Sequence, residues 1–378
     1  MGTFPQIIKR LDQKILSTSG VDSYEEIIKI LLIKLYAEIE NNNRLFNTQD
    51  AEELNVFLKK ADKKWPKVIK DTKFQISQSL LKECLAEVEN INIFQQDASI
   101  FDSAIEYLLP HTHRGTRGQF MTPRHVVREI IEMLSPKNDE KIIDPACGSG
   151  GFLEYAILFQ KNNRKEYTEK NVFGADYDER MTRIARLITL KISGTEANIS
   201  STNSLNNIKY NNKFDIVVSN PPYGGLVSDE NILKKFNISK NSKGEVQKTF
   251  RHTLFIEKCI SSAKPGGRIA LVLPQGVLNN TRMKKARDMM LANCRLVAVI
   301  SLPQSTFMPH TNVKTSIVIL EKWEGKVKKN YKVFMAISEK SGKDKKGKII
   351  LKNNNVDHDL KDIRKKFNTF RKKEDISW

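Results

Sequence analysis

Hydrophobic positions along this chain follow two patterns. From residue 141 onward, short apolar runs such as 142–144, 172–175 and 214–219 alternate with longer segments in which apolar residues recur every three or four positions. Short runs of this kind are typical of buried parallel strands, and the longer segments are typical of helices that cover a sheet. The alternation predicts an α/β fold with a doubly wound, mostly parallel sheet between residues 141 and 320.

The first 110 residues show only the helical pattern. Ser23 followed by Glu26 is a capping-box pattern, and it opens a segment whose apolar residues between 27 and 39 form one broad face. Further helices are predicted from Asp50, over 76–88 and over 100–108. We therefore predict an N-terminal all-α domain over residues 1–110, with packing against its neighbour as the default role.

The remaining segments complete the predicted order. Strands are expected at 196–200, 268–274, 296–302 and 315–320, with helices at 249–263 and 283–291. Residues 224–248 lack periodicity, and a long loop of this kind is typical of a functional or disordered segment. Residues 326–378 are expected to form a basic tail with a short helix at 360–370. The predicted domains are thus 1–110, 111–325 and 326–378.

Composition limits the class of protein. In 378 residues, 39% are hydrophobic and 28% charged, and no apolar run reaches membrane-spanning length. The four scattered cysteines and the absence of a secretory pattern at the start favour the cytoplasm. An excess of 63 basic over 44 acidic side chains favours a polyanionic partner, although a lysine-rich composition can arise without one.

A proline pair carries the strongest chemical signal. Asn220-Pro221-Pro222-Tyr223 directly follows the apolar run 214–219, so it lies where a buried strand ends. The prolines provide no N–H donors, and the carbonyls of the turn and the Asn220 side chain are acceptors. Together with the flat ring of Tyr223, these acceptors suit a planar amino group. A proline-rich turn without chemistry is the alternative.

Two acids end neighbouring strands. Asp144 begins the turn Asp-Pro-Ala-Cys-Gly-Ser-Gly-Gly, whose glycines allow a ligand to approach the backbone closely. This turn resembles the dinucleotide fingerprint but lacks its glycine spacing, which argues against NAD. Asp176 ends the next strand and is suited to accept hydrogen bonds from ribose hydroxyls. Capping of the following helix is the alternative role, for which Asp178 is better placed.

The motifs between residues 119 and 320, in this order, resemble those of the N6-adenine DNA methyltransferases, especially the modification subunits of type I restriction-modification systems. The resemblance implies a class I S-adenosylmethionine-dependent methyltransferase fold, with a seven-stranded sheet whose last strand is antiparallel. It also implies S-adenosylmethionine as cofactor, with Met121 replacing one aromatic of the family pattern. The positions that match the family's cofactor-binding residues are Phe120, Thr122, Asp144, Ala146, Gly148, Gly150, Asp176, Asn203 and Asn220.

On the substrate side, the resemblance implies transfer of a methyl group to N6 of an adenine flipped out of the duplex. Asn220 and the carbonyl of Pro221 would accept from the amino group, and Tyr223 would stack on the base. Asn203 could instead be a plain turn residue, and Phe307 a core plug at a strand end. The positions that match the family's catalytic residues are Asn220, Pro221, Pro222, Tyr223 and Phe307.

The resemblance also suggests partners. Only 58 residues follow the last predicted strand, which is too few for the target-recognition domain of self-sufficient relatives. We therefore expect double-stranded DNA, a specificity subunit and a restriction subunit as partners. No metal is expected, because His111 and His113 lack an accompanying Cys or carboxylate cluster. The alternatives are a methyltransferase acting on protein glutamine or RNA with the same tetrapeptide, and a non-catalytic relative that binds DNA or a partner.

Overall fold

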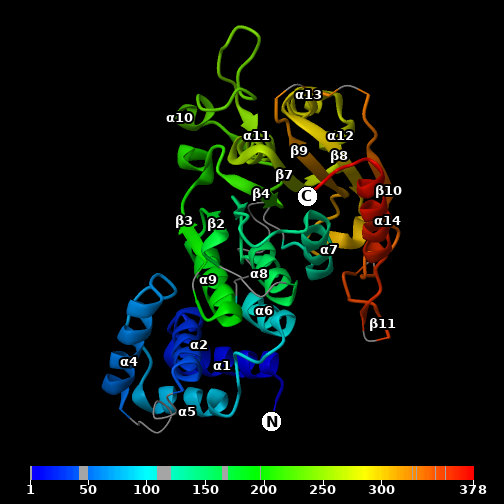
Figure 1. The fold of residues 1–378 in the computed structure, drawn as a ribbon. Helices are drawn as coiled ribbons and strands as arrows, with labels where there is room; N and C mark the ends of the chain where they lie inside the picture. Colours follow the sequence, from blue (N-terminus) through cyan, green and yellow to red (C-terminus); the bar gives the residue numbers. More distant parts are fainter. Residues whose placement is uncertain are drawn as a thin grey trace.

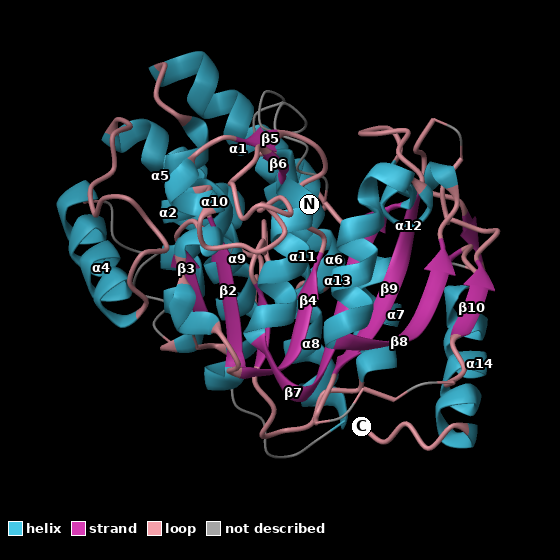
Figure 2. Ribbon diagram, turned by 90° about the horizontal axis from the view of Figure 1, so that it is seen from above, coloured by secondary structure: helices cyan, strands magenta, loops and turns pink. Residues whose placement is uncertain are grey.

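An eight-stranded sheet forms the centre of the molecule (Figures 1 and 2). The computed structural model describes residues 2–41, 50–108, 121–163, 169–195, 197–325, 327–328, 330–344, 346–353 and 355–378. The strands of the sheet are β1 (Ile142–Asp144), β2 (Val172–Asp176), β3 (Asn198–Ser201), β4 (Phe214–Ser219), β7 (Ala263–Pro274), β8 (Cys294–Ser301), β9 (Thr315–Lys322) and β10 (Phe334–Ile337). Their order across the sheet is β10-β8-β9-β7-β4-β1-β2-β3.

The direction of the strands confirms the predicted doubly wound topology. Neighbouring strands are parallel except where β9 pairs antiparallel with both β7 and β8. The antiparallel last strand of the predicted seven is therefore present. The prediction of seven strands was wrong by one, because β10 adds an eighth parallel strand beside β8. This strand lies in the segment that we predicted to be a basic tail.

The eighth strand forms because two of its four residues reach the core. The ring of Phe334 lies 5.5 Å from that of Phe367 and 5.6 Å from that of Phe370, both on helix α14 (Leu360–Lys373). Met335 and Ile337 point the other way and are each 73% exposed. Four apolar residues in a lysine-rich segment give too short a pattern to be distinguished from a solvated linker.

Alternate residues of the strands face two separate hydrophobic layers. Ile216 and Val218 belong to one layer, whereas Val217 between them belongs to the other. The first layer includes helices α7 (Arg124–Leu134), α8 (Gly151–Asn163), α9 (Glu179–Ser193) and α14. The second includes α10 (Glu230–Leu233), α11 (Arg251–Ser262), α12 (Gln275–Asn279) and α13 (Lys284–Asn293). Helices therefore cover both faces, as expected for strands that are apolar throughout.

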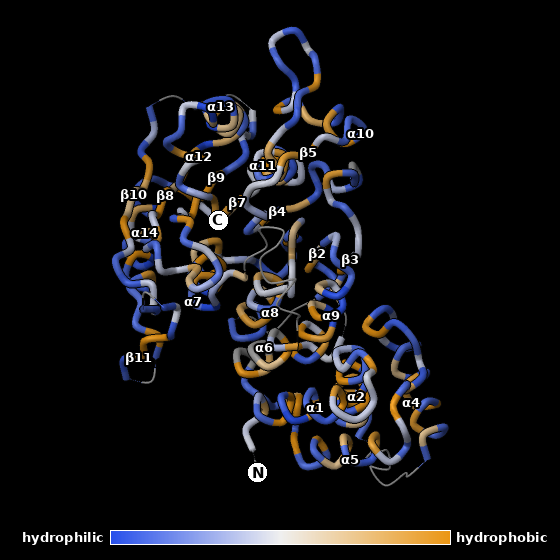
Figure 3. Tube along the Cα trace, turned by 180° about the vertical axis from the view of Figure 1, so that it is seen from behind, coloured by the Kyte–Doolittle hydropathy of each residue, from blue (hydrophilic) through white to orange (hydrophobic). Residues whose placement is uncertain are grey.

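The N-terminal region is helical, as predicted. Its helices are α1 (Phe4–Ser19), α2 (Ser23–Ile39), α4 (Ala51–Lys64), α5 (Gln78–Glu89) and α6 (Ala98–Tyr107). Along the tube of Figure 3, α1 and α5 alternate between hydrophobic and hydrophilic residues, as helices with one buried face do. Helix α4 begins next to Asp50, as predicted, and Asp50 is its cap, with its carboxylate accepting from the N–H of Glu52 at 3.0 Å.

The capping-box prediction for α2 was wrong. Asp22, one residue earlier, accepts from the N–H of Tyr24 at 3.2 Å and is the cap. Ser23 instead donates to Asp12 at 2.5 Å. Glu26 is fully buried and forms an ion pair with Lys29 at 2.9 Å, so its carboxylate is not available to the helix start. A carboxylate just before the serine supplied a better acceptor for the first turn.

The helical region docks on α9. Arg183 forms two hydrogen bonds with the Glu25 carboxylate, at 2.6 and 2.7 Å, and the Tyr24 hydroxyl donates to the carbonyl of Arg180 at 3.0 Å. Buried residues of α1 and α2 belong to the same hydrophobic layer as those of α9. The first hydrophobic layer contains residues from both sides of positions 110 and 325. The division of the chain into domains at these positions therefore stays a prediction.

Residues 224–248 are more ordered than their sequence suggested. Strands β5 (Leu226–Val227) and β6 (Thr249–Phe250) pair as an antiparallel ribbon that closes this segment at its base. Beyond it, the Glu257 carboxylate of α11 accepts from the N–H groups of Asn237 and Ile238 at 2.9 and 2.8 Å. A shorter hairpin pairs β11 (Leu351–Lys352) with β12 (Asn355–Val356) in the basic segment.

No helix in the described ranges has the length and apolar character needed to span a membrane.

Candidate active site

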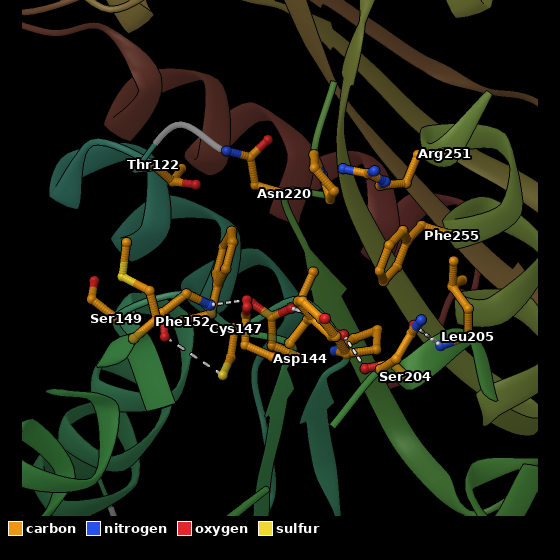
Figure 4. A pocket seen from close by; sticks show the side chains of 18 of the residues that line it. Thr122, Asp144, Cys147, Ser149, Phe152, Ser204, Leu205, Asn220, Arg251 and Phe255 are labelled. Atoms are coloured by element: carbon orange, nitrogen blue, oxygen red, sulfur yellow. Dashed lines mark hydrogen bonds between the residues drawn. The ribbon is translucent and has the colours of Figure 1, made fainter. Parts of the chain in front are cut away.

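A cavity of about 570 Å³ opens at the carboxyl ends of β1, β2 and β4 (Figure 4). Its size is within the range of small-molecule sites. Asp144, Asp176 and Asn220, which end or directly follow these three strands, all line it. The sheet thus brings together residues that lie far apart in the sequence, because parallel neighbours end at the same edge.

Asp144 lies at the floor of the cavity and is almost fully buried. One of its oxygens, Oδ1, accepts from the N–H of Ala146 at 2.9 Å and from the hydroxyl of Ser219 at 2.8 Å. Burial raises the pKa of Asp144 to about 7, against the opposing effect of these two hydrogen bonds. A carboxyl with such a pKa gains its charge readily when a cation binds beside it.

The glycine-rich turn adopts backbone conformations that favour glycine. Gly148 and Gly150 have φ angles of +52° and +88°. A Cβ atom on Gly150 would lie 2.9 Å from the Cβ of Ala185, so this glycine lets α9 pack closely against the turn. No atom lies within 4 Å of the corresponding position on Gly148, which lines the cavity together with Ala146. Gly148 and Ala146 therefore line the cavity, whereas Gly150 packs against α9 on the other side of the turn.

Cys147 is part of this turn but is not suited to be a nucleophile. Its backbone N–H donates to the carbonyl of Ala175 at 3.0 Å, which joins the turn to β2. Its side chain is buried, and burial raises the pKa of the thiol well above its ordinary value. The role of Cys147 is therefore to fill a small space in the turn.

Asp176 and Asp178 divide two tasks. Asp178 caps α9 by accepting from the N–H groups of Arg180 and Met181, at 3.0 and 3.5 Å, which confirms it as the cap. Asp176 accepts from the N–H groups of Gly148 and Asp178, both at 2.9 Å. Burial raises the pKa of Asp176 above its ordinary value. Each Asp176 oxygen keeps acceptor capacity toward the cavity.

The tetrapeptide Asn220-Pro221-Pro222-Tyr223 is folded inward. The hydroxyl of Tyr223 donates to Oδ1 of Asn220 at 2.5 Å, and the Tyr223 side chain is 9% exposed. Its ring meets that of Phe307 edge-on, with 6.1 Å between centroids. Phe307 is 1% exposed and ends the short helix η6 (Gln304–Phe307), a position that matches the core-plug alternative. Asn220 and Pro222 line the cavity, whereas Pro221, Tyr223 and Phe307 are not among its lining residues.

The other predicted cofactor residues take different positions. Asn203 lines the cavity, and its Oδ1 accepts from the N–H of Leu205 at 3.1 Å, so it combines a cavity position with the turn role. Thr122 also lines the cavity; helix α7 begins at Arg124, and its cap is Pro123 rather than Thr122. Phe120 lies outside the described residues. The roles proposed for all these residues stay predictions.

Several cavity residues carried no recognisable signal in the sequence. Arg251 and Phe255 come from the start of α11, after the segment that lacked periodicity, and Tyr177 follows Asp176. Figure 4 shows Arg251 and Phe255 on the side of the cavity opposite Thr122 and Ser149. Tyr177 could have been found from its place at the end of β2, whereas Arg251 depends on how the preceding segment folds.

No group of three or more His, Cys, Asp or Glu side chains suited to hold a metal ion occurs in the described part of the chain.

Comparison with curated proteins finds type I restriction enzymes. The methylase subunit of EcoEI from Escherichia coli is 30% identical over 257 residues, which cover 65% of this chain and 51% of that protein. The MjaIX methylase subunit from Methanocaldococcus jannaschii is 27% identical over 196 residues, which cover 50% of this chain and 35% of that protein. The chain thus spans about half, or less, of the length of these relatives.

Solved structures share the fold. The methyltransferase subunit of a type I restriction-modification system from Streptococcus thermophilus superposes with a TM-score of 0.62 at 16% identity, covering 97% of this chain and 92% of that one. A chain from a structural study of type I assembly gives a TM-score of 0.66 at 22% identity, covering 98% and 82%. The sheet with its antiparallel β9 is accordingly the fold of class I S-adenosylmethionine-dependent methyltransferases.

A family model described as N-6 DNA Methylase matches residues 96–378, a span that contains the cavity and all eight strands of the sheet. The acid, the glycine-rich turn and Asn-Pro-Pro-Tyr all lie within this span, in the order in which the sequence presents them. This chain belongs to the N-6 DNA methylase family.

Proposed function

We propose that this chain transfers a methyl group from S-adenosylmethionine to the N6 amino group of an adenine in double-stranded DNA, as the modification subunit of a type I restriction-modification system. The observation that carries the proposal is the placement of Asn220 in the same cavity as Asp144 and Asp176. The Asn220 amide could then accept from an amino group in the same cavity in which Asp144 and Asp176 offer carboxylates to a cationic nucleoside. The proposed compartment is the cytoplasm, where the DNA is.

The cavity residues fit S-adenosylmethionine. The cofactor carries a sulfonium and an ammonium group, and the buried carboxyls of Asp144 and Asp176 provide complementary charge. Asp176 and Asn203 would hold the nucleoside, and the backbone around Ala146 and Gly148 would hold the methionine part. When bound, the cofactor supplies an electrophilic methyl group on its sulfonium.

The tetrapeptide supplies orientation. Oδ1 of Asn220 and the carbonyl of Pro221 would accept both hydrogens of the adenine amino group, which turns its lone pair toward the methyl group. Two fixed acceptors also stabilise the positive charge that develops on nitrogen in the transition state. No covalent intermediate is required, which agrees with the buried, protonated thiol of Cys147. The barrier would fall through positioning and electrostatics.

Stacking of the adenine on Tyr223 would require this side chain to move, because Tyr223 does not line the cavity. Its hydroxyl occupies Oδ1 of Asn220, the acceptor proposed for the amino group, and its ring packs against Phe307. Extrusion of the adenine costs a few kcal/mol. Stacking of the base on the released Tyr223 ring would contribute about 1–3 kcal/mol toward this cost.

The test is transfer of labelled methyl from S-adenosylmethionine to genomic DNA from a methylation-free host. The chain is assayed alone and with the co-expressed specificity protein of the same system, and products are identified as N6-methyladenine. We expect N6-methyladenine with the partner and little without it. Tight cofactor binding with no transfer to DNA in either case would contradict the proposal, and release-factor protein and RNA would then be tested as acceptors.

A further inference from the structure

Two arginines line the cavity, and their surroundings differ. Arg124 forms an ion pair with Glu154. Arg251 is half-buried, and within the described residues its guanidinium forms no ion pair or side-chain hydrogen bond. A partly desolvated guanidinium without a partner costs free energy that a bound anion would offset. Arg251 is therefore a candidate to bind an anionic group that enters the cavity.

The backbone holds Arg251 next to the catalytic turn. Its N–H donates to the carbonyl of Gly225 at 2.9 Å, and Gly224 and Gly225 directly follow Tyr223. The pairing of Leu226 with Phe250 in the β5–β6 ribbon fixes the same connection from the other side. The position of Arg251 thus depends on the ribbon, and the side chain extends from α11 into the cavity (Figure 4).

The β5–β6 ribbon lies beside Arg251 and carries exposed apolar side chains. Leu226 and Phe250, the paired residues of the ribbon, are 55% and 39% exposed. The glycine-rich turn, which would hold the methionine part of the cofactor, lies across the cavity with Ser149 and Thr122. Arg251 therefore lies beside the ribbon and across the cavity from the glycine-rich turn.

We infer that Arg251 binds a DNA phosphate beside the flipped adenine. The inference rests on the proposed function and adds a phosphate subsite to it. A guanidinium presents a planar set of donors that matches phosphate oxygens. The flipped adenine and its phosphate belong to the same nucleotide, so a contact to the phosphate also positions the base. The contact would fix the nucleotide backbone while Asn220 holds the amino group, so Arg251 positions the substrate rather than reacting with it.

The test compares four proteins, each with the specificity partner: wild type, Arg251→Ala, Arg251→Lys and Arg282→Ala. Arg282 lies at the start of η5 (Thr281–Met283), is exposed, and does not line the cavity, so it controls for general loss of charge. The probe is a labelled mixed-sequence duplex with one mismatched adenine, because a mismatch lowers the cost of flipping. Its dissociation constant is measured from low to high salt, and cofactor binding is measured by calorimetry.

We expect Arg251→Ala to weaken duplex binding on the order of tenfold at low salt. The plot of log affinity against log salt should become shallower by about 0.9, the value for one lost phosphate contact. Arg251→Lys should keep the slope, since it keeps the charge, and lose part of the affinity. Cofactor affinity should be unchanged in all variants, and a folding defect would be seen as a loss of cofactor binding.

Three results would overturn the inference. An unchanged salt slope for Arg251→Ala would show that no phosphate is bound there. Weakened cofactor binding without a change in duplex binding would assign Arg251 to the cofactor carboxylate. An equal effect of Arg282→Ala would show a diffuse charge effect rather than a site. A wild-type protein that binds this duplex but transfers no methyl to DNA would instead contradict the proposed function, which separates the two failures.

Discussion

The two sides of the cavity are built differently. On the side of β1 and β2, the carboxyls of Asp144 and Asp176 accept hydrogen bonds from backbone N–H groups at 2.9 Å. On the side of β4, Asn220 accepts from the side chain of Tyr223, and Arg251 forms no side-chain hydrogen bond among the described residues. The first side is held mainly by main-chain donors, with the Ser219 hydroxyl as one side-chain donor to Asp144, whereas the second side consists of side chains that can exchange partners. Changes to the first should therefore alter cofactor binding and stability, and changes to the second should alter turnover.

The largest effect is expected on the substrate side. Asn220→Ala removes the acceptor that we propose for the adenine amino group, and loss of one preorganised hydrogen bond at a reacting centre costs about 10²–10³ in rate. Methyl transfer to DNA should fall by this factor or more, while cofactor affinity stays near wild type. Asn293→Ala, at the exposed end of α13, is the matched control. A comparable loss of cofactor affinity would show that Asn220 belongs functionally to the other side.

On the cofactor side, Asp176→Asn should act on binding. An amide in this place presents only one oxygen to the N–H groups of Gly148 and Asp178. Hydrogen bonds to a charged acceptor contribute about 1.5–3 kcal/mol, so cofactor affinity should fall about 10- to 100-fold and the melting temperature should also drop. Calorimetry and thermal unfolding measure the two quantities. If methyl transfer falls while cofactor affinity and melting temperature stay unchanged, the proposed difference between the cofactor side and the substrate side is wrong.

Substitutions in the glycine-rich turn test whether its main-chain conformation stabilises the cofactor side of the cavity. Gly150→Ala combines a φ of +88° with a 2.9 Å approach to Ala185, so we expect about 1–3 kcal/mol less unfolding free energy. Gly148→Ala shares the strained backbone, with φ +52°, but has open space for its Cβ, and it should cost less stability. Denaturant unfolding of both variants compares them. Equal losses would exclude close packing with α9 as the cause.

A smaller effect concerns pH. Burial raises the folded-state pKa of Asp144 from 3.8 to about 7, so between these values the folded chain binds more protons than the unfolded chain. Stability without cofactor should therefore fall as pH rises from about 4 to 7 and then level off. A bound cation favours the ionised carboxyl, so cofactor affinity should rise through the same window with release of a proton. Calorimetry in two buffers of different ionisation enthalpy detects that proton, and Asp144→Asn should abolish its release.

The smallest change is expected from Tyr223→Phe. The variant keeps the ring that packs on Phe307 but loses the hydroxyl that occupies Oδ1 of Asn220. One neutral hydrogen bond contributes about 0.5–1.5 kcal/mol, so turnover should change by no more than about tenfold, whereas Tyr223→Ala should lose far more by losing the stacking surface. Single-turnover methyl transfer measures both. Equal losses would mean that the hydroxyl, not the ring, carries the function.

The sequence predicted the parts of the site that depend on the main chain. The apolar run before Asn220 and the acids at the ends of β1 and β2 define a sheet edge, and the edge places them together without further information. The sequence also identified Asp178 as the cap of α9, because an acceptor just before a helix has one obvious use.

What the sequence could not predict depends on side chains and on irregular backbone. The inward rotamer of Tyr223 follows from packing against Phe307, more than eighty residues later in the chain. Arg251 enters the cavity only because the β5–β6 ribbon returns the chain to Gly225. Strand β10 is an apolar run of only four residues, and contact with helix α14 explains why Phe334 faces the core. Each of these features needs a contact between distant residues that no local pattern records.

The position of β9 has a consequence for how the protein is made. β9 lies between β7 and β8, although β8 precedes it in the chain. During synthesis β7 therefore emerges with one edge unpaired, and β8 cannot occupy that edge in the final structure. The gap closes only after Lys322 has left the ribosome, and β10 can then add beside β8. Until that point, the nascent chain carries an open apolar strand edge, the kind of surface that chaperones bind.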